Sequence, residues 1–465
     1  MVKLFDHQVK AGKILRESPR FALFHEPGSG KTISVLSVID SDLIPTVVVA
    51  PKSVVDSAWV RDAQHFPRLK VRTLRAGDGN RLAAINDDWD VLATNPEMFK
   101  KYAERLIGAG ARRLVFDESS KLKSPDTAIT KAAIAFADRM ESVILLSGTP
   151  APNSWTEYWG QVRCLLGPKC RPYMQWCYAH GYPVRENIRI KGGKLRSVIA
   201  RWDQTPEQAE ALTSKLKNIS WALSKRECLD LPAQVDRVID VRLSDQEIAA
   251  YLRAREDLVL RFADRRVRID PAAALGKLRQ VVGGGVYAEG EAESVSDSPA
   301  KLDALHDYLD ELGPKTPCLI WFEYRHERDR IVEAIRERGE EVRTIDGETS
   351  GEAGQTAADF QAGRFSRLVL HPQAAGHGIT LHRASHAIYY ALNFSYELWE
   401  QSRARIHRAG MGDAPATYTI LRAELGDGDA GRTVDHAMLN TVRNKGKASQ
   451  GMLDALRDAG VKEPA

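Results

Sequence analysis

Residues 25–32 read HEPGSGKT and directly follow the apolar run 21–24. A glycine-rich loop that leaves a buried strand can fold its backbone N–H groups around a phosphate, and the helix after it adds a positive N-terminal dipole. Lys31 is expected to reach the β- and γ-phosphates, and the Thr32 hydroxyl to bind Mg²⁺. The first glycine of the usual pattern is His25 here. The segment therefore predicts a strand–loop–helix unit that binds a nucleoside triphosphate.

The chain has 465 residues, 43% of them hydrophobic and 28% charged, a size that allows two or three hydrophobic cores. A formal net charge of +4 does not by itself indicate a nucleic-acid partner. The sequence has no apolar run long enough for a membrane span and no signal-peptide core, so we expect a cytoplasmic protein without membrane association. Five widely spaced cysteines fit a reducing compartment. Cys164, Cys170, Cys177 and His180 lack the spacing of a zinc site, and we expect buried structural thiols there.

Short apolar segments alternate with helical patterns in two parts of the chain, which is typical of parallel α/β sheets. In the first part the expected strands are 21–24, 46–50, 71–74, 91–94, 114–116 and 142–147. In the second part they are 317–322, 342–345, 367–370, 386–390 and 417–421. Between the two parts, 155–226 loses the alternation, 244–280 has helical periodicity, and 283–298 reads as a loop. The expected fold class is α/β, with two parallel-sheet lobes and helical insertions between them.

Two carboxylates, Asp117 and Glu118, follow the expected strand 114–116. Downstream of a phosphate-binding loop, such a pair is expected in an NTPase, with Asp117 holding Mg²⁺ and Glu118 polarising the attacking water. Taken alone, an Asp-Glu pair would be a solvated strand end. The phosphate-binding pattern upstream favours the NTPase interpretation.

A third candidate element lies at the end of the expected strand 142–147, where residues 147–150 read SGTP. Small hydroxyl side chains at the carboxyl end of a strand can sense a neighbouring phosphate or metal. Taken alone, the segment would be a plain turn, but here it follows the two preceding motifs in order.

Further candidates lie near the two ends of the chain. Arg405 and Arg408 are three residues apart and would share one face if their segment is helical, so that their guanidinium groups could stabilise the charge of a transferring phosphoryl group. A solvated basic helix is the alternative. Gln8 precedes the first strand and could read the edge of adenine with its amide group.

Taken in order, these segments resemble the Swi/Snf-type DNA translocases of helicase superfamily two, over nearly the whole chain. The N-terminal segments that carry the resemblance are FDHQ, HEPGSGKT, VVVAPKSVVDSAWVRD with Trp59, VLATNPEM, VFDESSKLKS and LLSGTPAPN. The C-terminal ones are SKRECLDLPAQVDRVIDVRLSDQEIAAY, CLIWFEY, TIDGETS, HPQAAGHGITLHRASHAIYY and QSRARIHRAG. The resemblance implies two RecA-like lobes that bind ATP and Mg²⁺ and move on duplex DNA.

The resemblance also assigns roles to residues at matching positions. It implies ATP contacts from Gln8, Pro27, Gly28, Ser29, Gly30, Lys31, Thr32 and Gly378. It implies that hydrolysis depends on Lys31, Asp117, Glu118, Arg405 and Arg408, and that Mg²⁺ is held by Thr32 and Asp117. Hydrolysis would require the second lobe to close on the first.

Nucleic-acid contacts are expected from a smaller set of side chains. The motifs suggest Lys52, Ser53, Thr94, Asn95 and Thr380. Residues 185–201 predict a basic hairpin that turns at a Gly-Gly pair. Its proposed DNA contacts are Arg189, Lys191, Lys194 and Arg196. A solvated edge hairpin, whose charges prevent aggregation, is the alternative.

Three segments depart from the pattern of the resembled family. The carboxylate motif is usually DEAH or DEGH and here reads DESS, which weakens its expected coupling to the SGTP segment. The segment at 371–373 reads His-Pro-Gln instead of opening with Ser-Thr, and 409–411 reads Ala-Gly-Met instead of Ile-Gly-Gln. DNA contacts at the first of these two segments are therefore in doubt.

The predicted division has three parts: lobe 1 over 1–227 with an insertion at about 155–226, a linker and helical protrusion over 228–300, and lobe 2 over 301–465 with a closing helix. The leading hypothesis is an ATP-driven translocase on double-stranded or forked DNA, which could work with replication or recombination proteins. A strand-separating DNA or RNA helicase and an ATP-gated nucleic-acid clamp without motor activity are the alternatives. The minimal architecture suggests a bacterial or phage protein, acting in the bacterial or infected-host cytoplasm.

Overall fold

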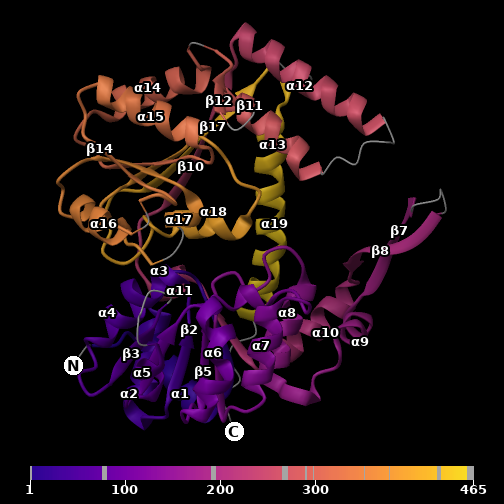
Figure 1. Ribbon diagram of the computed structural model, residues 1–465, viewed down its shortest axis with the longest axis vertical. Helices are drawn as coiled ribbons and strands as arrows, with labels where there is room; N and C mark the ends of the chain where they lie inside the picture. Colours follow the sequence, from indigo (N-terminus) through magenta and orange to yellow (C-terminus); the bar gives the residue numbers. More distant parts are fainter. Residues whose placement is uncertain are drawn as a thin grey trace. The chain divides into compact units, whose positions relative to one another are not determined.

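The computed structural model describes residues 3–75, 81–189, 195–263, 271–288, 291–296, 298–349, 351–375, 378–426 and 431–457. The chain forms two compact units (Figure 1). Unit 1 comprises Met1–Leu229 together with Gly446–Ala465, and unit 2 comprises Asp230–Lys445. Each unit contains its own parallel sheet with helices packed against it, so the predicted α/β class with two parallel-sheet lobes is confirmed.

The sheet of unit 1 has seven strands in the order β3-β4-β2-β5-β6-β1-β9, and every neighbouring pair is parallel. In chain order the strands are β1 (Arg20–His25), β2 (Thr46–Val49), β3 (Val71–Leu74), β4 (Val91–Thr94), β5 (Arg113–Asp117), β6 (Ser142–Leu146) and β9 (Ser220–Leu223). The first six agree with the predicted strands. The order places β6 between β1 and β5, so the loops that leave these three strands meet at one edge of the sheet.

Helices cover both faces of this sheet. The larger ones are α1 (Asp6–Glu17), α2 (Lys31–Asp42), α5 (Arg81–Asn86), α6 (Pro96–Gly108), α7 (Ala128–Ala137), α8 (Tyr158–Leu166), α9 (Tyr173–His180) and α10 (Pro206–Lys217). Short helical turns are α3 (Lys52–Val54), α4 (Arg61–Ala63) and α11 (Lys225–Cys228). Side chains of β2 alternate between two cores, since Val47 and Val49 pack into one hydrophobic cluster and Val48 into the other.

Unit 2 has a six-stranded parallel sheet in the order β10-β17-β16-β13-β15-β14. Its strands are β10 (Gln234–Arg242), β13 (Cys318–Trp321), β14 (Val342–Ile345), β15 (Arg367–Leu370), β16 (His386–Tyr389) and β17 (Ala416–Glu424). Its helices are α12 (Asp245–Ala263), α13 (Pro271–Val282), α14 (Ala300–Leu312), α15 (Arg325–Glu337), α16 (Ala353–Gln361), α17 (Pro372–Ala375) and α18 (Tyr396–Arg403). The last helix, α19 (Val434–Arg457), begins in unit 2 and ends in unit 1.

Two antiparallel hairpins stand apart from the main sheets. The predicted basic hairpin is present as β7 (Tyr182–Arg189) and β8 (Leu195–Asp203), and it extends beyond α9 and α10 (Figure 1). The second hairpin consists of β11 (Gly285–Ala288) and β12 (Glu291–Ser294). The prediction of a plain loop over 283–298 was therefore wrong. Its glycine-rich start allows the backbone to pack closely, because a Cβ on Gly285 would lie 2.9 Å from the Nδ1 of His326.

The end of α19 belongs to unit 1, although 301–465 was predicted to form lobe 2. Leu453 is buried in a hydrophobic cluster of unit 1. The Arg457 Nη2 donates to Glu26 Oε1 at 3.0 Å, and Glu26 lies in the loop that follows β1. These contacts explain why the last described turns of α19 group with unit 1.

A buried ion pair holds the start of α19 inside unit 2. The Nζ of Lys301 lies 2.6 Å from Asp435 Oδ2 and donates to the Tyr390 carbonyl at 3.0 Å, and the exposed side-chain fractions of the two charged residues are 1% and 4%. The same carboxylate accepts a hydrogen bond from the Ala423 N–H at 3.0 Å. The pair therefore connects α14, β17 and α19.

We expect Lys301→Met to lower the free energy of unfolding of unit 2 by about 3–5 kcal/mol, because it leaves a buried carboxylate without its cation. Denaturant titration, monitored by hydrogen exchange in peptides of unit 2, measures this loss. Lys315→Met, at an exposed position of the same unit, is the matched control and should change the stability by less than about 0.5 kcal/mol. Equal effects of the two substitutions would show that the buried pair does not stabilise the unit.

Candidate nucleotide site

The loop between β1 and α2 has the backbone of a phosphate-binding loop. Gly28 has φ +93° and Gly30 φ +78°, the left-handed region that glycine adopts without strain. A Cβ on Gly30 would lie 2.2 Å from the Nε2 of Gln8, so this position also lacks room for a larger side chain. The loop ends at the N-terminus of α2, where backbone N–H groups and the helix dipole favour an anion.

Lys31, the first residue of α2, folds back onto the loop. Its Nζ donates to the His25 carbonyl at 2.6 Å and to the Glu26 carbonyl at 3.3 Å. Burial lowers the pKa of Lys31, while Glu118 and Asp117 act in the opposite direction. The ammonium group is therefore placed where negative charge is favoured.

The first turn of α1 is attached to the same loop. The Phe5 N–H donates to Gln8 Oε1 at 2.9 Å, and Gln8 Nε2 donates to the Gly30 carbonyl at 3.4 Å. The His7 Nε2 lies 2.8 Å from the Ser29 carbonyl. Gln8 is thus in contact with the predicted phosphate loop, although 22 residues separate it from Gly30 in the sequence.

Asp117 ends β5 as a buried carboxylate. Its Oδ2 accepts a hydrogen bond from the Trp59 indole Nε1 at 2.9 Å, and its Oδ1 accepts one from the Glu118 N–H at 3.1 Å. Burial raises the pKa of Asp117, and the Trp59 hydrogen bond and the charge of Lys31 lower it. Glu118 has φ +58°, which is unusual for a residue with a side chain and turns the chain sharply after β5.

The loop after β6 lies against the phosphate loop. The Thr149 N–H donates to Ser147 Oγ at 3.1 Å and closes a tight turn. A Cβ on Gly148 would lie 2.5 Å from Cδ of Pro27. The predicted third element is thus in direct contact with the first.

These groups fit a triphosphate with a divalent cation. The Ser29 Oγ is buried and has no hydrogen-bond partner within the described part of the chain, so it is free to bond a ligand. Glycine N–H groups, one lysine and one carboxylate are the usual set for a phosphate with Mg²⁺. Thr32, at the second position of α2, is half-buried beside them.

Unit 2 contains the remaining predicted nucleotide residues. Arg405 is buried, and its guanidinium donates to the Ile379 carbonyl at 2.8 Å and to the Gln401 carbonyl at 3.0 Å. Arg408 is half-buried, and Gly378 adopts φ +78°. Arg405 therefore attaches the segment after α18 to the segment around residue 380.

The residues of unit 1 that were predicted to contact nucleic acid differ in their exposure and in the hydrogen bonds that they make. Lys52 and Ser53 are exposed at α3. Thr94 is completely buried, and its hydroxyl donates to the Leu74 carbonyl at 2.9 Å, so this conformation does not expose it to DNA. Asn95 caps α6, because its side chain accepts the N–H groups of Glu97 and Met98 at 3.0 Å. In this conformation its oxygen is already used by the helix.

The remaining predicted contacts are only partly described. Arg196 is exposed on β8, where it faces Ile188 of β7, and Thr380 is half-buried in unit 2. The side chain of Arg189 and the whole of Lys191 and Lys194 lie outside the described residues. The DNA-binding role of the hairpin stays a prediction.

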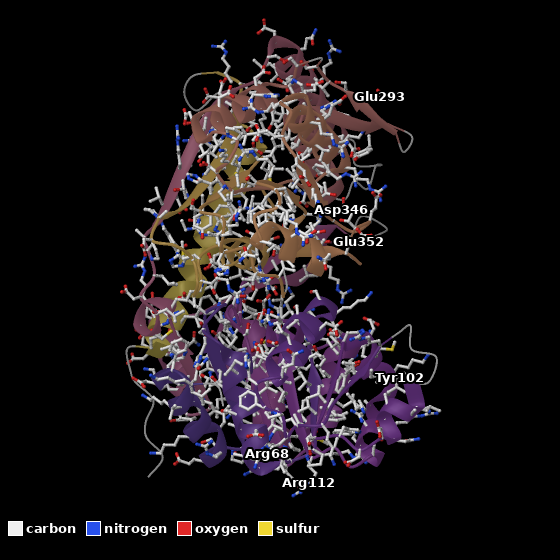
Figure 2. All side chains as sticks on the ribbon, turned by 90° about the vertical axis from the view of Figure 1, so that its left-hand side faces the viewer. Arg68, Tyr102, Arg112, Glu293, Asp346 and Glu352 are labelled. Carbon is white, nitrogen blue, oxygen red and sulfur yellow. The ribbon has the colours of Figure 1, made fainter. Side chains whose placement is uncertain are left out.

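Unit 2 has a cavity of about 440 Å³ at the carboxyl ends of β13, β14 and β15. Asp346, labelled in Figure 2, lies in its wall and accepts a hydrogen bond from Arg328 Nη1 at 2.7 Å. Burial opposes ionisation here, but the bonds from Arg328 and from the backbone of Thr349 and Glu348 lower the pKa of Asp346 overall. In the wall of this cavity, Arg325 and Arg328 pair with Asp346 and Glu348.

The edge of the unit 1 sheet opposite the candidate nucleotide site carries ion pairs of exposed arginines. Arg68 and Arg112, labelled in Figure 2, precede β3 and β5 and so lie at the amino ends of the strands. Arg112 pairs with Glu141 at 2.6 Å, and Arg68 pairs with Asp40 at 3.2 Å. These exposed pairs contribute little to stability.

Three cysteines of unit 1 belong to one of its hydrophobic clusters. Cys164, Cys170 and Cys177 are buried free thiols, and burial raises the pKa of Cys164 to about 12. Among the described residues, no three His, Cys, Asp or Glu side chains are grouped so that they could hold a metal ion. No helix in the described part of the chain has the length and hydropathy that a membrane span needs.

Two known protein families match parts of this chain. Residues 16–281 match the SNF2-related domain, and residues 300–410 match the helicase conserved C-terminal domain. The first match covers more than half of the chain, and the chain therefore belongs to the SNF2-related family, within the group of helicase-like ATPases.

Individual relatives are similar to this chain over most of its length. Protein p41 of Acyrthosiphon pisum secondary endosymbiont phage 1 is 23% identical over 92% of this chain and 93% of that protein. The DNA annealing helicase and endonuclease ZRANB3 of Mus musculus is 22% identical over 96% of this chain, which spans only 40% of that protein. A solved structure, the Sulfolobus solfataricus SWI2/SNF2 ATPase core in complex with dsDNA, is 21% identical, with a TM-score of 0.43 over 97% of this chain and 94% of that one.

Contact between the loops can be tested at Gly148. We expect Gly148→Ala to lower the free energy of unfolding of unit 1 by about 1–3 kcal/mol, because the new methyl group would overlap the Pro27 ring. Gly108→Ala, at the end of α6, is the control and should be neutral or slightly stabilising, because a Cβ on Gly108 would have nothing within 4 Å. Thermal unfolding of both variants measures the difference. Equal melting temperatures would mean that the two loops are not in close contact.

Proposed function

We propose that this protein is an ATP-dependent motor that hydrolyses ATP and moves on duplex or forked DNA. The observation that carries the proposal is the joining of three loops at one edge of the sheet in unit 1. These loops bring Lys31, the Asp117 carboxylate and the Ser147–Thr149 turn to the carboxyl ends of β1, β5 and β6. Membership of the helicase-like SNF2-related family supports the same conclusion.

ATP with Mg²⁺ would supply the phosphoryl group whose transfer to water drives the motion. The glycine N–H groups and Lys31 would neutralise the phosphates, and Gln8 would orient the nucleotide from the first turn of α1. Thr32 and Asp117 would hold the cation, while Glu118 would accept a hydrogen bond from the attacking water.

The arginines of unit 2 would take different parts in this reaction. Arg405 already donates to two backbone carbonyls, so we assign it the positioning of its segment. Arg408 is more exposed, so we assign it the contact with the phosphates when unit 2 closes on unit 1. Coupling hydrolysis to closure would make each cycle a step along the nucleic acid.

Duplex or forked DNA is the proposed substrate. ZRANB3, one of the relatives, is named a DNA annealing helicase. Lys52, Ser53, Thr380 and the β7–β8 hairpin with its exposed Arg185 and Arg196 are the proposed contacts to phosphates. A protein acting on forks would work beside replication or recombination proteins.

Steady-state ATP hydrolysis tests this function directly. The chain is assayed alone and with single-stranded DNA, duplex DNA, forked DNA or RNA, with Lys31→Ala as the inactive control. We expect duplex or forked DNA to stimulate hydrolysis, with at least about a 100-fold loss of kcat in the control, because a phosphate-neutralising cation is missing. The variant Arg185→Glu/Arg196→Glu should need more DNA for half-maximal stimulation.

Other outcomes of this assay identify the alternatives. Stimulation by single strands or RNA alone would favour a strand-separating helicase. Binding of ATP and DNA without stimulated hydrolysis would favour a nucleic-acid clamp. Equal activity of Lys31→Ala and the unchanged protein would contradict the assigned nucleotide site.

The environment of Asp117 predicts a pH dependence. Burial already raises the pKa of this carboxyl group, and the Trp59 N–H stabilises its charged form. Trp59→Phe removes that donor, so the pKa of Asp117 should rise further. Because hydrolysis needs the ionised carboxylate, the acid limb of its pH profile should shift to higher pH. The pH profile of kcat/KM measures the shift.

Trp89→Phe is the matched control for this prediction. Trp89 is also buried, and its Nε1 donates to the Ile85 carbonyl at 3.1 Å, away from the carboxylate. Its substitution should leave the acid limb of the profile unchanged. If the acid limb of the pH profile shifts equally in both variants, or in neither, Trp59 does not influence the ionisation of Asp117.

A further inference from the structure

Two buried hydrogen bonds connect the turn after the carboxylate pair to the turn after β6. The Ser119 hydroxyl donates to Gln161 Oε1 at 2.8 Å, and the Gln161 Nε2 donates to the Pro150 carbonyl at 2.8 Å. Ser119 is 0% exposed and Gln161 is 1% exposed. Gln161 lies on α8, after the LLSGTPAPN segment and outside the other segments that carry the resemblance.

The helix that carries Gln161 is fixed in place by close packing. A Cβ on Gly160 would lie 2.0 Å from the carbonyl oxygen of Leu122, so α8 contacts the backbone of the turn after β5 directly. Tyr158, on the same helix, is buried against Phe24 of β1 with a ring-centroid distance of 5.9 Å. A side chain amide held this firmly transmits small displacements between its two partners.

The connection continues to the phosphate loop. Gly148, two residues before Pro150, packs against Pro27, and Ser119 directly follows Glu118. The path from Glu118 through Ser119, Gln161 and Pro150 to Pro27 therefore joins all three loops of the nucleotide site. The motif around Asp117 reads DESS, and this path uses its first serine.

We propose that Gln161 is a positioning residue that couples the carboxylate turn to the turn after β6 during ATP hydrolysis. This inference rests on the proposed ATPase function and names a residue that acts through Ser119 and Pro150 and touches no substrate. A change in the position of Glu118 moves the Ser147–Thr149 turn through this amide. The same amide keeps Glu118 aligned for its water.

The test compares Gln161→Met, Ser119→Ala and the double variant with the unchanged protein. Methionine keeps the volume of glutamine and removes both hydrogen bonds. At a temperature where all variants are folded, we expect kcat of Gln161→Met to fall about 10-fold, while KM and the dissociation constant of a fluorescent ATP analogue stay within about twofold. The double variant should lose no more than Gln161→Met alone, because the two side chains act in one path.

Gln204→Met is the matched control, since the Gln204 Nε2 also donates to a backbone carbonyl, that of His180, at 2.7 Å. Its kcat should be unchanged. A Gln161→Met variant with unchanged kcat per folded molecule would overturn the proposal. A fall in kcat matched by an equal loss of nucleotide binding would also overturn it, because it would mean a general loss of structure.

A second measurement separates this proposal from the proposed function. Hydrogen exchange of peptides covering 119–122 and 147–152 is recorded with and without a non-hydrolysable ATP analogue. We expect the analogue to change exchange in both segments of the unchanged protein, but only in 119–122 of Gln161→Met. If the protein binds ATP without hydrolysing it, the exchange of these two segments still shows whether Gln161 couples them. An equal response of 147–152 in both proteins would contradict the coupling.

Discussion

The mutual stabilisation of the Lys31 and Asp117 charges governs the candidate nucleotide site. Burial disfavours the charged form of Lys31 and also that of Asp117, and each partly restores the charge of the other. Polar neighbours offset part of the cost of burying these charges. The Trp59 N–H, the carbonyls of His25 and Glu26, and the sharp turn at Glu118 are the neighbours that the fold provides. The sheet order is what brings these groups together, because it places the ends of β1, β6 and β5 side by side.

Much of the fold could be predicted from the sequence because several central strands are fully buried and read as short apolar runs. β2 and β4 are examples, with every residue buried. β10 could not be found this way, since it is an edge strand with mostly exposed side chains and charges along its length. β9 reads SWAL and lies in the part of the chain, 155–226, where the strand–helix alternation is lost, so no apolar run marks it. The β11–β12 hairpin was missed because glycine and polar residues indicate a loop as readily as a hairpin.

The site was predictable where chemistry depends on local spacing and unpredictable where it depends on long-range contacts. The loop with Lys31 and the pair Asp117-Glu118 follow from their own segments. The hydrogen bonds that Trp59 and Gln161 make cross 58 and 42 residues of sequence, and no local pattern indicates their partners. Thr94 makes another contact that local spacing does not indicate. A hydroxyl at the end of a strand suggests a ligand contact, but here it satisfies a neighbouring backbone carbonyl.

The left-handed backbone at Glu118 restricts which amino acids fit this position without strain. A left-handed conformation costs a residue with a Cβ roughly 1 kcal/mol or more relative to glycine, and asparagine would also tolerate it better. Local conformational preference therefore favours two residue types that have no carboxylate. The chain has glutamate here and bears the strain, which agrees with the role proposed for its acid group and not with the conformational preference of the turn.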